Sequence, residues 1–282
     1  MNARASSILL WIIALIITLS AAVYQRMTGP TYPVTASADI GGRVFEFELP
    51  RSHSGEGPAM IRVPTGARNV KGYLSFRRVN SNDEWTHQSM GIRRGTLIGL
   101  IPHQPPAGKV MYSVEFNAPA YSNAVATSEP VVIRFKGHVP SYVLIPHIIF
   151  IFAAMLFSTR TGLEALLKRS NVKRLTLWTT GLLLLGGMIL GPIVQKFAFG
   201  DFWTGWPLGT DLTDNKTAVA FIAWLFASWR VWRNPNSRWS PLIASIVLLV
   251  VYLIPHSMYG SELDYTSEVD APEPPKPGHL GE

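Results

Sequence analysis

The chain has 282 residues, of which 48% are hydrophobic and only 15% are charged. Soluble domains usually carry roughly 25% charged residues, so this deficit points to a membrane environment. Lys and Arg outnumber Asp and Glu by 25 to 18, a net charge of +7. Because the basic residues form no single patch, nucleic acid is not an expected partner. The absence of cysteine excludes disulfides, thiolate metal sites and cysteine nucleophiles.

The first apolar run covers residues 8–23 and follows a short segment that carries Arg4. Its length fits either a short membrane anchor or a long signal-peptide core, and residues 20–22 (Ser-Ala-Ala) offer a cleavage site. We expect residues 1–25 to be a retained anchor, with a cleaved signal as the alternative. In either case the residues that follow are expected to be exported.

Four further apolar runs lie late in the chain, within residues 140–260, and predict a four-helix transmembrane bundle. They cover residues 142–157, 175–194, 217–232 and 241–258. In the third of these runs, Gly187 and Gly191 form a Gly-x-x-x-Gly pattern that predicts close helix packing. Pro192 is expected to bend or end that helix.

Loop charges predict the orientation. Residues 159–174 carry five basic side chains and one acid, and residues 230–239 carry only basic ones, whereas residues 195–216 and the tail 261–282 are acidic. The positive-inside rule therefore places the two basic loops in the cytoplasm and residues 25–139 outside. This arrangement predicts a multi-pass protein of a bacterial inner membrane with a periplasmic C-terminus and a cytoplasmic N-terminus, provided that the first helix is retained.

Tryptophans gather near both predicted ends of the bundle and are expected to be membrane-interface anchors. They are Trp203 and Trp206 at the outer end, and Trp178, Trp229, Trp232 and Trp239 at the inner end.

Residues 30–139 read as strands, because apolar and polar residues alternate in several short runs between turn-forming clusters. The runs cover residues 34–38, 43–49, 60–63, 73–78, 96–101, 109–116 and 131–135. About seven short strands in a segment of this length predict an all-β sandwich.

The segment 101–116, Ile-Pro-His-Gln-Pro-Pro-Ala-Gly-Lys-Val-Met-Tyr-Ser-Val-Glu-Phe, resembles the strand–loop–strand of immunoglobulin and fibronectin type III-like modules. The resemblance covers one hairpin and implies a fold rather than an activity. The predicted fold class is therefore an α+β membrane protein, with five transmembrane helices and an exported immunoglobulin-like sandwich between the first two. No catalytic signature appears, so an enzyme is not the favoured expectation.

Unusual polar residues gather in residues 195–217 and 255–265, both predicted on the exported side. They form a candidate outer-face polar site of Asp211, Asp214, Asn215, Lys216, Glu262 and Asp264. One interpretation is a helix N-terminus that Thr213 or Asp214 caps, with Lys216 neutralising an aspartate or reaching the interface. The alternative is an oxygen-rich cation or substrate site.

His147 and His256 each follow a proline and are predicted at similar depth on the second and fifth spans. Neutral imidazole is a good ligand, so the pair is a candidate for a b-type haem or a metal ion. The alternative is that each ring bonds a backbone carbonyl that the neighbouring proline frees, or lines a helix interface.

The favoured function is an accessory or scaffold subunit, without a cofactor, whose partners are the lipid bilayer and other envelope or membrane proteins. Residues 261–282 form an acidic, proline-rich tail, of which residues 267–282 are expected to be extended or disordered. Electron transfer through haem is the alternative. Transport is disfavoured because no inverted repeat is visible, and an envelope enzyme that uses the outer acids is a weaker possibility.

Overall fold

The computed structural model describes residues 3–39, 44–66, 70–118, 121–125, 129–255, 260 and 262–266. The chain divides into two compact units. One consists of Met1–Pro30 and Val139–Ser261, and the other of Thr31–His138 and Glu262–Glu282. The first unit is helical and the second is built of strands, so the chain is a mixed α+β protein.

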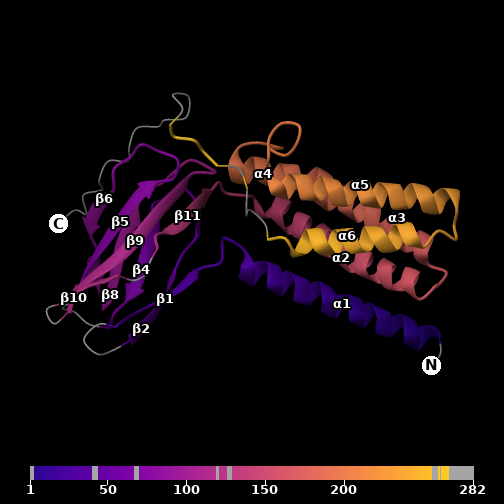
Figure 1. Cartoon of the computed structure of the whole chain (residues 1–282), viewed down its shortest axis with the longest axis horizontal. Coiled ribbons are helices and arrows are strands. Elements are labelled where there is room, and N and C mark those ends of the chain that lie inside the picture. Colours follow the sequence, from indigo (N-terminus) through magenta and orange to yellow (C-terminus); the bar gives the residue numbers. More distant parts are fainter. Residues whose placement is uncertain are drawn as a thin grey trace. The chain divides into compact units, whose positions relative to one another are not determined.

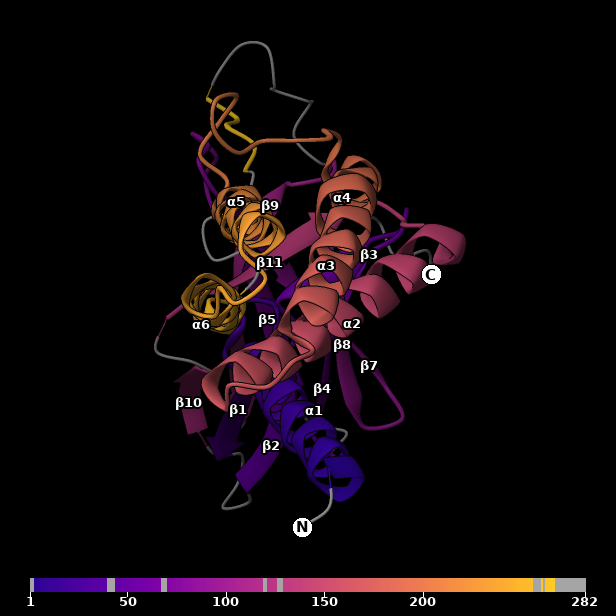
Figure 2. The same ribbon diagram turned by 90° about the vertical axis from the view of Figure 1, so that its right-hand side faces the viewer.

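The helical unit contains α1 (Ala3–Thr28), α2 (Ser141–Leu166), α3 (Val172–Leu183), a π-helical segment η1 (Leu184–Leu190), α4 (Gly191–Phe199), α5 (Leu212–Arg233) and α6 (Trp239–Leu253). The segments α3, η1 and α4 follow one another without a break and form one long helix. Helix α2 packs against α3 and α6, α5 packs against α3 and α6, and α1 lies along α2 (Figures 1 and 2).

Three of the helices in the described part of the chain are long and apolar enough to cross a membrane: Arg4–Thr28, Ser141–Leu166 and Val172–Phe199. The sequence predicted five such spans. Helix α6 is apolar but has only 15 residues. Helix α5 carries charged side chains near both of its ends and does not have the composition of the three long helices.

Of the two outcomes expected at Pro192, a bend or an end of the helix, the second does not occur, because the long helix continues to Phe199. The π-helical segment immediately before the proline explains the difference. Its wider turns pair the backbone N–H of Gly191 with the carbonyl of Gly186, and Pro192 then lies in the first turn of α4. Local π adjustment is a known way for an apolar helix to accommodate a proline, which has no N–H to donate.

Small residues let the helices approach one another closely. The buried core of the helical unit consists of Ala21, Ala154, Met155, Leu183, Ala220, Trp224, Ala227, Ala244, Leu248 and Tyr252. Hydroxyl groups add hydrogen bonds between helices, from Ser245 Oγ to the carbonyl of Ser158 at 2.9 Å and between Thr180 Oγ1 and Ser228 Oγ at 2.7 Å.

The second unit is built of the strands β1 (Val34–Asp39), β2 (Val44–Leu49), β3 (Ser52–Ser54), β4 (Ala59–Pro64), β5 (Lys71–Arg78), β6 (Thr86–Ser89), β7 (Gly91–Arg93), β8 (Thr96–Ile101), β9 (Lys109–Ala118), β10 (Tyr121–Val125) and β11 (Val131–Lys136). One sheet has the order β3-β11-β9-β5-β6, with β10 also paired to β9. A second sheet has the order β4-β8-β7, and β1 pairs with β2. Strands β3 and β11 are parallel, and the other pairs are antiparallel.

One apolar core joins the sheets. On β9 the side chains predicted to share one face, Val110, Tyr112, Val114 and Phe116, are all buried. The opposite sheet contributes residues such as Ile61 to the same core. Each of the seven predicted runs coincides with a strand. Four strands were missed. The strands β3, β6 and β7 have only three or four residues, too few to show an alternation, and the five residues of β10 do not alternate between apolar and polar.

The first described residues of the predicted tail, 262–266, pack on the β-unit. The ring of Tyr265 is buried, its hydroxyl donates to Gln104 Oε1 at 3.2 Å, and its backbone N–H donates to the carbonyl of Asn80 at 3.0 Å. The guanidinium carbon of Arg78 lies 4.5 Å from the ring centroid. The remaining tail, residues 267–282, lies outside the described residues.

Candidate functional site

Residues 200–211 join α4 to α5 at one end of the helical unit, and we call them the aromatic loop. Helix α4 ends at Gly200, whose left-handed backbone (φ 97°) suits a residue without a Cβ. Helix α5 begins after Asp211, whose Oδ1 accepts the backbone N–H of Thr213 at 2.7 Å. Asp211 is thus the N-cap, where the sequence suggested Thr213 or Asp214.

Asp214 holds the aromatic loop against the first turn of α5. Its Oδ2 accepts the backbone N–H of Thr204 at 2.7 Å, that of Gly205 at 3.0 Å, and Nε2 of Gln195 at 3.0 Å. A Cβ at Gly205 would lie only 2.6 Å from Asp214 Cβ, so glycine is needed for this close approach. Next to it, Asn215 Oδ1 accepts the backbone N–H of Trp206 at 2.7 Å.

These polar groups therefore face inward. Asp214 is only 6% exposed, Asp211 is buried as well, and the buried Lys216 donates from Nζ to the carbonyl of Ile254. The loop instead exposes large apolar side chains beside the polar Asp201 and Thr210: Phe202 is 57% exposed, and Trp206 and Leu208 are each 78% exposed. The loop thus presents a braced apolar tip rather than a row of acids.

The other two members of the predicted polar site, Glu262 and Asp264, belong to the β-unit. Glu262 forms an ion pair with Lys109 and accepts a hydrogen bond from Asn80 Nδ2 at 2.7 Å. Asp264 accepts the backbone N–H of Thr266 at 2.9 Å. Within the described ranges, no group of three or more His, Cys, Asp or Glu side chains is placed to hold a metal ion.

His147 lies on α2 opposite the π-helical segment, and its Nδ1 is 2.9 Å from the carbonyl oxygen of Gly186. Because a carbonyl only accepts, the proton of the neutral ring is on Nδ1 and the lone pair is on Nε2. His256 lies outside the described residues, so the predicted haem or metal pair stays a prediction.

The close helix contacts involve Gly186 as well as the predicted glycines. A Cβ at Gly186 would lie 3.0 Å from both Phe150 Cβ and the backbone nitrogen of Ile151 on α2. At Gly187 it would lie 3.0 Å from Thr217 Cγ2 on α5. At Gly191 the nearest atoms are 3.6 Å away or more. Gly186 thus approaches a neighbouring helix as closely as Gly187 does, although the Gly-x-x-x-Gly pattern does not include it. A still closer approach occurs at Gly162 on α2, where an added Cβ would lie 2.9 Å from Ser245 Cβ on α6.

The predicted interface tryptophans lie at the ends of helices. Those expected at the inner end are all exposed: Trp178, Trp229, Trp232 and Trp239. In the aromatic loop, Trp206 is exposed, whereas Trp203 is half-buried and donates from Nε1 to the carbonyl of Trp206 at 3.2 Å. Their role as anchors stays a prediction.

A buried ion pair on α2 was missed by the sequence analysis. Arg160 and Glu164 are 2% and 1% exposed and pair one helical turn apart, although both were expected in a loop. The expectation failed because α2 continues to Leu166 and buries this face. Arg160 also lies 5.5 Å from the ring of Trp11, and Glu164 Oε1 accepts the backbone N–H of Asn171 at 3.2 Å. The i, i+4 spacing of opposite charges directly after an apolar run was the available signal.

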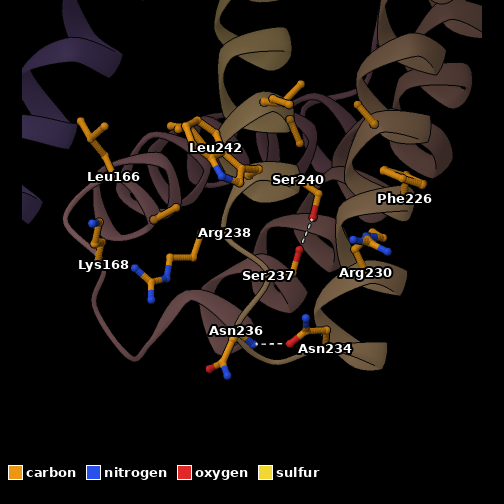
Figure 3. A pocket seen from close by; sticks show the side chains of 15 residues that line it. Leu166, Lys168, Phe226, Arg230, Asn234, Asn236, Ser237, Arg238, Ser240 and Leu242 are labelled. Carbon is orange, nitrogen blue, oxygen red and sulfur yellow. Dashed lines mark hydrogen bonds between the residues drawn. The ribbon is translucent and has the colours of Figure 1, made fainter.

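A cavity of about 880 Å³ opens at the same end of the helical unit, between the end of α2, the end of α5 and the start of α6 (Figure 3). Its wall combines aliphatic and aromatic side chains with the basic residues Lys168, Arg230 and Arg238.

No family model matches the chain, and no curated protein or solved structure matches it. Assignment of a function therefore rests on the residues and contacts described above.

Proposed function

We propose that the chain is an integral protein of a bacterial inner membrane. In this proposal it is an accessory or scaffold subunit, which offers the aromatic loop and a periplasmic β-domain to partner proteins of the envelope. The observation that carries the proposal is the bracing of the aromatic loop by Asp214, which holds large apolar side chains in an exposed position.

Three features support a membrane location. Three helices have the length and composition of spans. Their contacts rely on alanine, glycine and interhelical hydroxyl bonds, as is typical where lipid replaces water around a bundle. Exposed tryptophans and basic residues gather at one end, which suits a cytoplasmic interface. Retention of α1 is supported by its packing: Ala21 belongs to the buried core that α1 shares with the other helices, and α1 contacts α2 and α6.

We infer an immunoglobulin-like sandwich for the β-domain. In variable-type immunoglobulin domains, strands B, E and D form one sheet, and the sheet of G, F and C is extended by C′. The orders β4-β8-β7 and β11-β9-β5-β6 follow the same sequence of strands, and β3 adds a parallel edge beside β11. This likeness concerns the fold and does not identify a partner.

A binding role is assigned to the aromatic loop because Asp214 holds the loop in one conformation. A surface that is already ordered loses little conformational entropy on association, and tryptophan is prominent among residues that dominate binding energy. Phe202, Trp206 and Leu208 offer such an apolar contact. The partner that fits is an envelope or membrane protein with an apolar patch near the outer surface of the membrane.

Membrane placement is testable with single cysteines, because the chain has none of its own. Cysteines are introduced separately at Leu208, at Glu56 of the β-domain and at Asn236 between α5 and α6. A membrane-impermeant maleimide is expected to label positions 208 and 56 in intact spheroplasts, and position 236 only after the membrane is disrupted. The opposite pattern would overturn the orientation, and release of the chain by alkaline carbonate would overturn membrane insertion.

The hydrogen bond from His147 to Gly186 favours haem binding as a second candidate function. Ligating histidines usually donate their other ring N–H to a carbonyl or carboxylate, as His147 does, and this leaves Nε2 as the ligand atom. A b-type haem would supply one-electron transfer. The test is a reduced-minus-oxidised spectrum of protein made with excess haem. We expect the wild-type protein to show a haem absorbance band that each single variant, His147→Ala and His256→Ala, loses. Colourless wild-type protein would contradict haem binding.

A further inference from the structure

The cavity between α2, α5 and α6 is divided into an apolar and a polar part. Leu166, Leu242 and Phe226 lie at the top of Figure 3, whereas Lys168 and Arg238 lie lower, toward the turn between α5 and α6. Such a wall suits an amphipathic molecule whose apolar part continues along the helices and whose polar part reaches the surface.

The polar part is positively charged. Lys168 and Arg238 lie on one side of the cavity and Arg230 on the other (Figure 3). The wall contains no Asp or Glu, and within the described residues none of the three cations takes part in an ion pair. The charge of the cavity is therefore complementary to an anion.

Hydrogen-bond donors lie between these cations. Ser237 and Ser240 form part of the wall, and their hydroxyl oxygens are 3.1 Å apart. Helix α6 starts at the cavity, and its N-cap Arg238 makes no side-chain capping bond. The positive end of the helix dipole favours a negatively charged group at this place.

We propose that this cavity binds one anionic phospholipid of the inner leaflet. The phosphate lies between Arg230, Arg238 and the two serines, and an acyl chain lies along the apolar wall. Basic pockets between helices at the cytoplasmic side of a membrane bind anionic headgroups in this way. The inference rests on the proposed membrane location and adds a ligand that the docking function does not require.

The test is a lipid titration of the full chain in a mild non-ionic detergent, followed by native mass spectrometry. The probes are phosphatidylglycerol, phosphatidylcholine with the same acyl chains, and inorganic phosphate. Wild-type protein is expected to bind the first phosphatidylglycerol about tenfold more tightly than phosphatidylcholine or better. Each cation contributes roughly fivefold, so Arg230→Gln with Arg238→Gln is expected to weaken phosphatidylglycerol binding about 25-fold. Binding of the zwitterionic phosphatidylcholine is expected to weaken less, so that the preference for phosphatidylglycerol is lost.

Arg233→Gln is the matched control, because Arg233 lies at the same end of α5 but not in the cavity wall. It is expected to bind as the wild type does, and the thermal transitions of all variants are expected to agree. Equal binding of both lipids by the wild type, or unchanged binding by the double variant, would overturn the inference. Displacement of the lipid by millimolar phosphate would show a site for a soluble anion instead. A chain that carbonate extracts would contradict the membrane location itself, whereas an extraction-resistant chain without lipid preference contradicts only this inference.

Discussion

Oδ2 of Asp214 lies 2.7 Å from the backbone nitrogen of Thr204, so a carboxylate in the first turn of α5 holds the loop that precedes the helix. The same oxygen accepts the N–H of Gly205. A carboxylate that was a candidate for cation binding thus has a structural contact in the folded chain, and this contact keeps the apolar tip in place.

Asp214→Ala is expected to loosen the aromatic loop, because it leaves the N–H groups of Thr204 and Gly205 without their acceptor. Loss of such bonds to a buried group costs about 1–3 kcal/mol. Hydrogen exchange followed by mass spectrometry is expected to show faster exchange in residues 203–206. Asp201→Ala is the control, since Asp201 is exposed in the same loop. Equal exchange in the two variants would contradict the bracing role.

The buried pair of α2 predicts a non-additive double variant. Arg160→Leu leaves the Glu164 carboxylate buried without its counter-ion, which costs about 3–5 kcal/mol. Arg160→Met combined with Glu164→Met removes both charges and is expected to recover most of that loss. Thermal unfolding of the detergent-solubilised protein measures the effect. A double variant as unstable as the single one would show that the charges themselves do not determine stability here.

Helix packing predicts opposite effects of one substitution at two glycines. Gly181 has no atom within 4 Å of an added Cβ, so Gly181→Ala is expected to raise stability by up to about 1 kcal/mol through helix propensity. Gly186→Ala forces a Cβ to 3.0 Å from Phe150 Cβ and is expected to lower stability by about 1–3 kcal/mol. The measurement is the thermal transition temperature of each variant beside the wild type. A higher transition temperature in both variants would argue against the close contact of α2 with the π-helical segment.

The β-domain is expected to lose stability in acid through Asp83. Arg78 binds both oxygens of this carboxylate, at 2.7 and 2.8 Å, and these hydrogen bonds lower the pKa of Asp83 from its usual 3.8. The stabilisation is therefore complete above about pH 4 and is lost as the pH falls through the lowered value. A partly exposed pair of this kind contributes about 1 kcal/mol.

The measurement for this pair is the thermal transition of the β-domain in the full chain as a function of pH. Asp83→Asn is expected to flatten the acid limb between pH 4 and the acid end of the scan, whereas Glu84→Gln, at an exposed neighbour, is expected to leave it unchanged. If the transition temperature falls with decreasing pH equally in the wild type and in Asp83→Asn, the acid sensitivity does not come from Asp83.

Local pattern was enough to predict much of the fold. Residues 109–116 alternate between polar and apolar except at Met111. Every second side chain from Val110 to Phe116 is buried in the core, because a strand with one buried face has period two. Long apolar runs likewise predicted α1, α2 and the long helix from Val172 to Phe199. Strands of three residues, such as β3, carry no comparable signal.

Contacts between distant segments could not be predicted from pattern. Tyr265 lies in a polar, acidic stretch, and only its place between Arg78 and Gln104 shows that it is buried. Arg160 was predicted in a loop because the apolar run ends at residue 157, whereas α2 continues to Leu166. Asp214 was correctly placed at a helix N-terminus. The N–H groups that donate to it, however, depend on how residues 203–206 fold back, which no local preference determines.

The most direct test of the proposed docking function is photo-crosslinking from the tip of the aromatic loop. A cysteine introduced at position 208 carries a benzophenone maleimide and is irradiated in native membranes. We predict a discrete adduct with one envelope or membrane protein, lost when Asp214→Ala is added and absent from a probe at position 236. Adducts with lipid alone, or the same adducts from both positions, would contradict the account and leave the loop as a membrane-interface anchor.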